Sequence, residues 1–168
     1  SSCSYQMTYV PDDVFETYCE NRGWGNGVID DSVYTHIISA VQAVSHFSNT
    51  VVSDYTGIQD FINMYSFRIY DNSILTSLDL TMCTGLYSVE FDDLSSFSQL
   101  FLNDSMEEFW LINTAISSLD FSNSINLWDV YIENNSFLST LNLSGTPSLG
   151  YIYSSNNPNL FCIGVDSI

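Results

Sequence analysis

The segment that decides the fold reads MEEFWLINTAI at residues 106–116. Its spacing of apolar residues returns in LWDVYIENNSF at 127–137 and in LGYIYSSNN at 149–157. The copies begin at 106, 127 and 149, so the chain repeats every 21 or 22 residues. A coil of this length cannot bury its own apolar side, and successive coils must therefore stack on one another.

A period of 20 to 29 residues with the pattern L-x-x-L-x-L-x-x-N predicts a leucine-rich-repeat solenoid. Further copies begin at Met64 and Leu86, and a degenerate copy with His46 inside it begins at Val41. We call the final N of this pattern the asparagine slot. In the copy at 86 this slot holds Leu94, whose side chain cannot hydrogen-bond backbone groups of the turn as asparagine does, so the turn must be built differently. A truncated last coil is expected at Leu160-x-x-Ile163-x-Val165.

A second, shorter apolar pattern lies between these copies. It reads Leu78-x-Leu80, Leu100-x-Leu102, Leu119-x-Phe121 and Leu141-x-Leu143. Each coil should therefore have two inward-facing extended segments. The predicted fold class is a leucine-rich-repeat solenoid with a short parallel β-sheet and a mostly extended or irregular convex side.

The first forty residues do not repeat and predict a small helical N-terminal cap. A short helix is expected at 10–19, with Pro11 in its first turn and Val14, Phe15, Tyr18 and Cys19 on one face. A second short helix is expected near 31–38. We therefore divide the chain into a cap at 1–40 and a solenoid at 41–168, which together form one structural domain.

The charge of the chain is strongly acidic. It has 20 Asp and Glu against 2 Lys and Arg, which gives a net charge of −18. Nucleic acids and anionic membranes are therefore excluded as partners, because their affinity depends on cationic side chains. No apolar run is long enough for membrane insertion. The opening Ser1-Ser2-Cys3 indicates a mature, processed form. In an exported protein a Cys3–Cys19 disulfide is one expectation, and free cysteines are the alternative.

Four segments carry a resemblance to a family: MTYVPDDVF at 7–15, TGI at 56–58, LTSLDL at 75–80 and NPNLFCI at 157–163. They resemble secreted leucine-rich-repeat proteins of marine and freshwater Bacteroidetes, which are similar in architecture to internalins. The resemblance implies export, an extracellular or cell-surface location, and binding rather than catalysis.

The sequence offers little for catalysis. The only histidines are His36 and His46, and no G-x-S-x-G motif occurs, so we predict that the chain is not an enzyme. Asn26 to Asp31 supplies oxygen ligands but misses the EF-hand spacing. We therefore assign no specific metal site and no cofactor, and expect at most weakly bound Ca²⁺; the alternative is a solvated acidic turn.

The outward positions of the repeat strands combine aromatic and acidic side chains. These candidate ligand- or partner-binding residues are Tyr65, Arg68, Tyr70, Tyr87, Glu90, Glu108, Trp110, Trp128, Asp129, Tyr131, Tyr151 and Tyr153. Such a surface suits recognition of a protein or a glycan, because aromatic rings offer large contact areas and acids offer polar contacts. The alternative is that these side chains only stabilise the sheet as cross-strand ladders.

Candidate modification sites follow two patterns. N-x-S/T triplets place N-glycans at Asn103, Asn134 and Asn142. D-S-apolar triplets resemble Bacteroidetes O-glycosylation sites and place glycans at Ser32, Ser105 and Ser167.

Two functions are consistent with the sequence. The first is an extracellular binding or adhesion protein that uses the aromatic and acidic strand positions. The second is a structural subunit whose copies assemble into a fibre, with or without glycosylation, through heterologous contacts that do not close.

Overall fold

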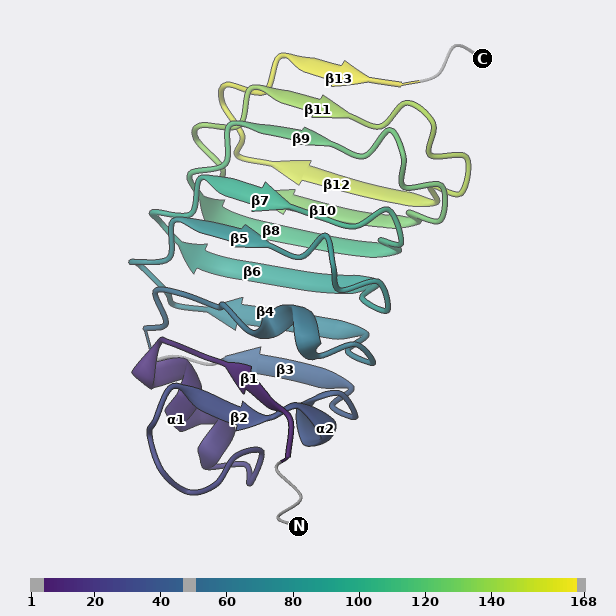
Figure 1. Ribbon diagram of the computed structural model, residues 1–168. Helices are drawn as coiled ribbons and strands as arrows, with labels where there is room; N and C mark the ends of the chain where they lie inside the picture. The colour runs from purple at the N-terminus through teal and green to yellow at the C-terminus, as the bar shows by residue number, and fades with distance from the viewer. Residues whose placement is uncertain (1–4, 47–50, 166–168) are drawn as a thin grey trace.

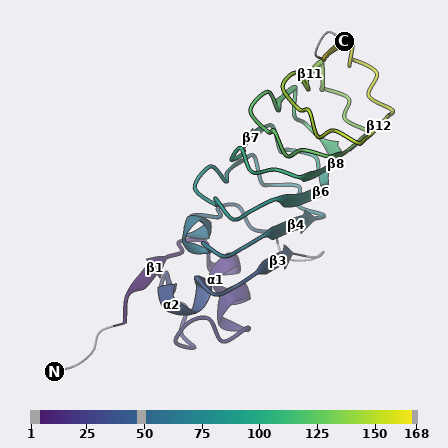
Figure 2. The same ribbon diagram turned by 90° about the vertical axis from the view of Figure 1, so that its right-hand side faces the viewer.

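The computed structural model describes residues 5–46 and 51–165. The chain forms a parallel β-solenoid of about five turns with a small cap at its N-terminal end, which confirms the predicted fold class. Figures 1 and 2 show the coils stacked from the cap to the C-terminal end, with one wall of strands on each side. Among the described residues, no helix is long and apolar enough to cross a membrane.

The main wall is a parallel sheet in the order β12-β10-β8-β6-β4-β3. Its strands are β3 (Ala43–His46), β4 (Ser66–Tyr70), β6 (Ser88–Leu94), β8 (Glu108–Thr114), β10 (Asp129–Glu133) and β12 (Tyr151–Ser155). Every strand lies at an expected repeat position. In register, Phe67 pairs with Val89 and Val89 with Phe109, so one inward position is repeated from coil to coil.

The second wall contains the shorter strands, as the second apolar pattern predicts. They are β5 (Ser77–Asp79), β7 (Gln99–Phe101), β9 (Ser118–Asp120), β11 (Thr140–Asn142) and β13 (Cys162–Gly164). This wall is split, because β5 pairs with β7 while β9, β11 and β13 form a separate sheet. The connection from Leu102 to Met106 is two residues shorter than that from Leu80 to Leu86, which accounts for the break between β7 and β9.

The last coil corrects one prediction. Leu160-x-x-Ile163-x-Val165 has the spacing of a main-wall repeat, yet β13 belongs to the second wall and pairs in parallel with β11. The reason is that β12 has already used the main-wall position of this coil. The apolar spacing alone does not distinguish the two walls.

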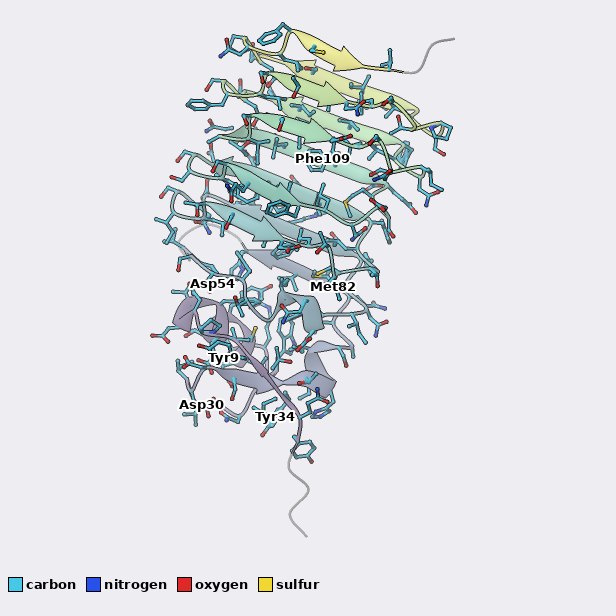
Figure 3. All side chains as sticks on the ribbon, turned by 45° about the horizontal axis from the view of Figure 1, so that its top comes forward. Tyr9, Asp30, Tyr34, Asp54, Met82 and Phe109 are labelled. Carbon is cyan, nitrogen blue, oxygen red and sulfur yellow. The ribbon has the colours of Figure 1, made fainter. Side chains whose placement is uncertain are left out.

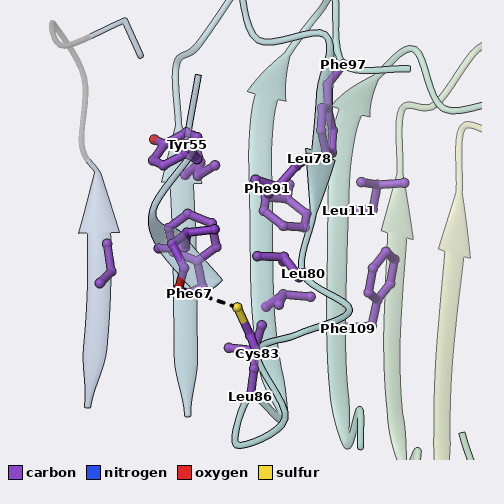
Figure 4. Close-up of a cluster of buried hydrophobic side chains, with 14 of the residues drawn as sticks. Tyr55, Phe67, Leu78, Leu80, Cys83, Leu86, Phe91, Phe97, Phe109 and Leu111 are labelled. Atoms are coloured by element: carbon purple, nitrogen blue, oxygen red, sulfur yellow. Dashed lines mark hydrogen bonds between the residues drawn. The ribbon is translucent and has the colours of Figure 1, made fainter. Parts of the chain in front are cut away.

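Large apolar side chains fill the space between the walls. Phe67, Phe91 and Phe109 point inward from the main wall, and Leu78 and Leu80 point inward from the second wall (Figure 4). All five are buried. The buried residues form one cluster from Val10 in the cap to Leu143, so the cap and the coils share a core.

From β4 onward, each coil turns at the end of its main-wall strand through a residue with left-handed backbone geometry. These residues are Asp71, Asp93, Asn113, Asn134 and Asn156, with φ between 50° and 59°. Asp and Asn adopt this conformation more readily than other side chains, which explains why they recur at this position. The sequence shows this signal as an Asp or Asn directly before each asparagine slot.

The asparagine slot that follows joins neighbouring coils. Asn135 donates to the carbonyls of Leu111 and Glu133, each at 2.9 Å, and its Oδ1 accepts from the backbone amide of Thr114 at 2.9 Å. In the coil with Leu94, the Phe97 amide donates to the Leu94 carbonyl at 2.9 Å, and the Asn135 turn has the equivalent bond from Leu138 at 3.2 Å. The Leu94 turn therefore shares this backbone bond but has no side-chain amide at the slot to bond the neighbouring coil.

The cap differs from the prediction at both of its helices. Helix α1 spans Asp13–Glu20, one turn later than expected, because Asp12 is its N-cap and accepts from the amides of Val14 and Phe15. Of the helix expected near 31–38, only the single turn α2 (Thr35–Ile38) is helical, and Ser32–Tyr34 form strand β2. Strand β2 pairs antiparallel with β1 (Met7–Tyr9). Figure 3 shows Tyr9, Asp30 and Tyr34 at this end of the molecule.

A buried carboxylate organises the loop between α1 and β2. Glu16 is fully buried and accepts from the backbone amides of Asp30, Asp31 and Ser32 at 2.9 to 3.1 Å. These three bonds hold the loop extended into β2 instead of letting a helix begin there. Because Glu16 of α1 binds these amides, the first half of the segment expected to be helical is strand β2 instead.

Asp12 also fastens the cap to the first coil. Its Oδ2 accepts from the amide of Ser53 at 2.8 Å and from that of Asp54 at 3.2 Å. Burial alone would raise the pKa of Asp12, but hydrogen bonds from Ser53, Phe15 and Asp54 outweigh burial and hold this pKa below its ordinary value. The carboxylate is therefore stabilised in its charged form.

The 3₁₀ turn η1 (Ile58–Asp60) lies against β1, since the Thr8 hydroxyl donates to Asp60 Oδ2 at 2.6 Å. Gly57 precedes this turn with φ 101°, and a Cβ there would lie 2.7 Å from the Tyr9 carbonyl oxygen. Glycine is therefore required by both the backbone conformation and the close approach of β1.

Candidate binding face

The outward side of the main wall carries the predicted binding residues in aligned columns. The central column pairs Arg68 with Glu90, Glu90 with Trp110, Trp110 with Tyr131, and Tyr131 with Tyr153. We call the twelve predicted residues together the strand face. They divide into two groups along the sheet. The N-terminal group, on β4, β6 and the residues directly before them, is Tyr65, Arg68, Tyr70, Tyr87 and Glu90. The C-terminal group, on β8, β10, β12 and the residue directly before β10, is Glu108, Trp110, Trp128, Asp129, Tyr131, Tyr151 and Tyr153.

The N-terminal group is largely paired within itself. The rings of Tyr65 and Tyr87 stack at 5.5 Å between centroids, with an interplanar angle of 11°. Arg68 Nε lies 3.5 Å from Glu90 Oε2. Burial, followed by the hydrogen bond with Glu90, raises the pKa of Tyr70 to about 12. The two charged side chains of this group, Arg68 and Glu90, are therefore already paired with each other.

The C-terminal group contains an aromatic ladder. Tyr131 and Tyr153 stack at 4.5 Å with an angle of 14°, and Trp110 lies 6.1 Å from Tyr131 at an angle of 53°. The Tyr131 hydroxyl donates to Glu133 Oε2 at 2.5 Å, and this bond raises the pKa of Tyr131 to about 12. In this ladder the two tyrosine rings thus stack on one another, and a hydrogen bond to Glu133 holds the Tyr131 hydroxyl.

Exposed rings and carboxylates lie beside this ladder. Trp110, Trp128 and Tyr151 are exposed, and Asp129 pairs with both Glu108 and Tyr151 in register. Burial and the neighbouring carboxylate of Glu108 raise the pKa of Asp129. Glu108 accepts from the Ser88 hydroxyl at 3.0 Å. Unlike the N-terminal group, this group holds carboxylates without an Arg or Lys among its members.

Two acidic residues of this surface were missed by the sequence analysis. Asp92 pairs with Tyr70 in register, and burial followed by Asp93, Glu90 and Asp71 raises its pKa. Glu107 lies between Tyr87 and Trp128, because its amide donates to the Tyr87 carbonyl and its carbonyl accepts from Trp128. The repeat register would have identified both, since they occupy the positions of aromatic or acidic residues in neighbouring coils.

The two histidines lie in different surroundings. His46 is buried in the core beside the cap, and its Nδ1 lies 3.0 Å from the Tyr55 hydroxyl. Burial, followed by the nearby Arg22, lowers the pKa of His46 to about 4. His36 is exposed and stacks on Tyr5 at 5.1 Å. His46 Nε2 is buried and has no hydrogen-bond partner among the described residues.

The acidic turn considered for calcium is held by its own hydrogen bonds. Asn26 Nδ2 donates to Asp30 Oδ2 at 3.0 Å, and the Ser32 hydroxyl donates to Asp30 Oδ1 at 2.8 Å. Asp13, Glu16 and Asp31 also bring carboxylate oxygens within 4.8 Å of one another. Glu16 already accepts from three backbone amides, and weak Ca²⁺ binding stays a prediction.

The predicted modification sites have different surroundings. Asn103 is buried, and its Nδ2 donates to the Cys83 carbonyl at 2.6 Å. Asn134 is exposed, and Asn142, Ser32 and Ser105 are partly exposed. Ser167 lies outside the described residues. Glycosylation stays a prediction at all of these sites.

The proposed disulfide also stays a prediction. Cys19 is fully buried in the cap, and burial raises its pKa to about 12. Its expected partner, Cys3, lies outside the described residues. Cys83 is buried too and contacts the Ile58 carbonyl at 3.6 Å, as the dashed line in Figure 4 marks.

The fold is that of a leucine-rich-repeat solenoid. Its strand face carries aromatic and acidic side chains. No protein-family model and no curated protein sequence matches this chain. The structure is similar to the functional domain of InlJ from Listeria monocytogenes, a domain described as including a cysteine ladder. The similarity has 12% identity and a TM-score of 0.33, and it covers 99% of this chain but only 63% of that domain. At this level it supports no conclusion about function.

Proposed function

We propose that this chain is a non-enzymatic, extracellular binding protein that meets its partner through the C-terminal group of the strand face. The observation that carries the proposal is the exposure of Trp110, Trp128 and Tyr151 beside the carboxylates of Glu108 and Asp129. Exposed aromatic side chains on a rigid sheet give a partner a large contact area at little entropic cost.

A protein partner fits this surface better than a glycan. Pyranose rings stack on open aromatic faces, whereas Tyr131 and Tyr153 stack on each other at 4.5 Å. Their edges and hydroxyls remain usable by protein side chains. The carboxylates favour a partner surface with Lys or Arg, and the net charge of −18 repels anionic polymers.

Selection from a displayed random-peptide library tests the proposal, with a neutral-glycan array run in parallel. Peptides selected on the wild-type chain should be rich in Lys and Arg. Their affinity should fall about tenfold or more in Trp110→Ala, as expected for a central aromatic contact. Phe101→Ala is the matched control, because Phe101 is an exposed aromatic residue on β7 of the opposite wall.

Two outcomes contradict this assignment. Selected peptides that bind Trp110→Ala as well as wild type would place binding elsewhere. Glycans that alone show Trp110-dependent binding would replace the protein partner with a glycan.

Assembly of copies into a fibre is the second candidate. A head-to-tail fibre that continues the main sheet needs a free edge on β3. That edge is occupied by the cap, since the Tyr18 hydroxyl bonds both backbone groups of Ser45. The described structure therefore favours association of another geometry over an open fibre.

A further inference from the structure

The second wall is interrupted inside the solenoid, between β7 and β9. These two strands follow one another along the wall (Figure 1). Among the described strands, β7 pairs with β5 and β9 pairs with β11, but nothing pairs with the two edges that face the break. Strand edges of this kind present unpaired N–H and C=O groups. The break therefore offers backbone oxygens to a ligand.

A pocket of about 240 Å³ lies at this break. It is lined by residues of β7 and β9 and by the turns that follow them, among them Asp104, Asp120 and Ser124. No Lys or Arg is among its lining residues. A water molecule in the liquid occupies about 30 Å³, so the pocket has room for a small ion together with several waters.

The side chain of Ser124 indicates a ligand in this pocket. Ser124 is 5% exposed, and its hydroxyl has no hydrogen-bond partner in the part of the chain that the structure describes. Cys83 and Thr146 take the same position in two other coils. Cys83 Sγ contacts the Ile58 carbonyl at 3.6 Å. The Thr146 hydroxyl donates to the Leu143 carbonyl at 2.6 Å. Because buried polar groups are normally bonded, the free hydroxyl of Ser124 points to a partner that the chain itself does not supply.

Two carboxylates line the same pocket. Asp104 is exposed, and its carboxylate has neither a hydrogen bond nor an ion pair with any described residue. Asp120 Oδ1 accepts from the Ser122 amide and from Asn142 Nδ2, each at 2.9 Å, and these bonds leave Oδ2 for a ligand. Hydrogen bonds from the Ser122 amide and hydroxyl, and from Asn142, outweigh burial and hold the pKa of Asp120 below its ordinary value. Asp120 is therefore charged at neutral pH.

We propose that this pocket binds one Ca²⁺ ion, held by Asp104, Asp120 and the Ser124 hydroxyl, which joins the two parts of the second wall across the break. Ca²⁺ takes about six to eight oxygen ligands in a flexible geometry, and carboxylates, backbone carbonyls and waters are its usual ligands. Waters and carbonyls of the strand edges complete the shell. Mg²⁺ fits less well, because it demands a regular octahedron and gives up its waters reluctantly.

This site differs from the other places where cations could bind. It lies on the second wall, so it does not depend on the partner proposed for the strand face. It is also separate from the acidic turn at 26–31, where Asp30 already accepts from Asn26 and Ser32. The net charge of −18 attracts cations everywhere on the surface, and the test must separate that diffuse attraction from a built site.

Calorimetric titration of CaCl₂ into the metal-stripped chain tests the proposal. The experiment is run in about 0.15 M NaCl, because salt at this concentration screens diffuse attraction. Ca²⁺ should bind with saturation at one ion per chain, and more tightly than Mg²⁺. A titration that never saturates, or equal affinities for the two ions, contradicts the proposal.

Three variants assign the binding to this pocket. Asp104→Asn and Asp120→Asn should each weaken Ca²⁺ binding about tenfold or more, and Ser124→Ala should weaken it by a smaller factor. Asp79→Asn is the matched control, because Asp79 accepts from the Thr81 amide at 2.9 Å as Asp120 does in its own turn, but lies outside the pocket. Equal weakening by Asp79→Asn, or unchanged affinity in all three pocket variants, overturns the proposal.

Amide hydrogen exchange locates the ion. Ca²⁺ should slow exchange in β7, in β9 and in the turns that follow them, and Asp120→Asn should abolish this slowing. Without Ca²⁺ the variant should exchange like wild type, because asparagine keeps the Oδ1 acceptor that holds the turn. Slowing confined to residues 26–31 would place the ion in the acidic turn of the cap and contradict the assignment.

Discussion

The hydroxyl of Tyr18 lies between the backbone amide and carbonyl of Ser45, 3.1 and 3.0 Å from them. A side chain of the cap helix thus takes the place of a neighbouring strand at the edge of β3. The Tyr18 ring is held from both sides, by the Arg22 guanidinium 3.4 Å from its centroid and by the His46 ring at 3.8 Å. This contact closes the β3 edge of the main sheet.

Tyr18→Phe should destabilise the chain while keeping the ring contacts. The change leaves the amide and carbonyl of Ser45 without their partner, and unpaired backbone groups of this kind cost about 1–3 kcal/mol. Urea unfolding followed by circular dichroism measures the loss. Tyr9→Phe is the control, because Tyr9 is exposed. Equal stability of the two variants would show that water satisfies the β3 edge.

The stability of the chain should fall as pH drops from 6.5 towards 4. Burial lowers the pKa of His46 to about 4 from an ordinary 6.5, so in this window the unfolded chain binds a proton that the folded chain does not. The free energy of unfolding should decrease by up to about 3 kcal/mol. Chemical unfolding of wild type and His46→Phe at several pH values measures the difference. Parallel curves for the two proteins would show that His46 does not carry the effect.

Asn135→Ala should be among the most destabilising single changes outside the apolar core. Asn135 is fully buried and bonds Leu111, Glu133 and Thr114, so its loss leaves several backbone groups of two coils unpaired. The expected loss is about 3 kcal/mol or more. Asn126→Ala, at an exposed turn position, should change the free energy of unfolding by less than about 0.5 kcal/mol. A small effect at both positions would contradict the bridging role of the asparagine slot.

The repeat spacing made the solenoid predictable, because each inward position is specified again in every coil. Phe67, Val89 and Phe109 were assigned to one column from spacing alone, and the register confirms it. The cap occurs only once and lacks this redundancy. Its antiparallel β1–β2 pair is joined through α1, and the loop before β2 depends on Glu16 binding amides 14 to 16 residues away, which no local pattern encodes.

The sequence predicted which residues of the strand face point outward, but not which of their side chains contact one another. Alternation along the strands placed Trp110 and Tyr131 outward, and both are in adjacent positions of one column. The stacking of Tyr131 on Tyr153, and the salt bridge that occupies Arg68, depend on side-chain rotamers. Spacing in the sequence does not determine rotamers, so the split into a paired group and an open group came only from the structure.

Trp128→Ala distinguishes recognition from sheet stabilisation. If the exposed rings serve a partner, this change should cost less than about 0.5 kcal/mol of stability, as at ordinary surface positions. Tyr131→Ala removes two ring contacts and should cost about 1 kcal/mol or more. Thermal and urea unfolding of both variants give the comparison. A large loss for Trp128→Ala would favour the purely structural role of the aromatic residues.

The most direct measurement for the central claim is a map of backbone amide chemical shifts, recorded by NMR while a selected basic peptide is added. The proposed function predicts that the largest changes fall on outward residues of β8, β10 and β12, around Trp110 and Tyr131. Changes that instead gather on the second wall, on the cap or on β13 would contradict it.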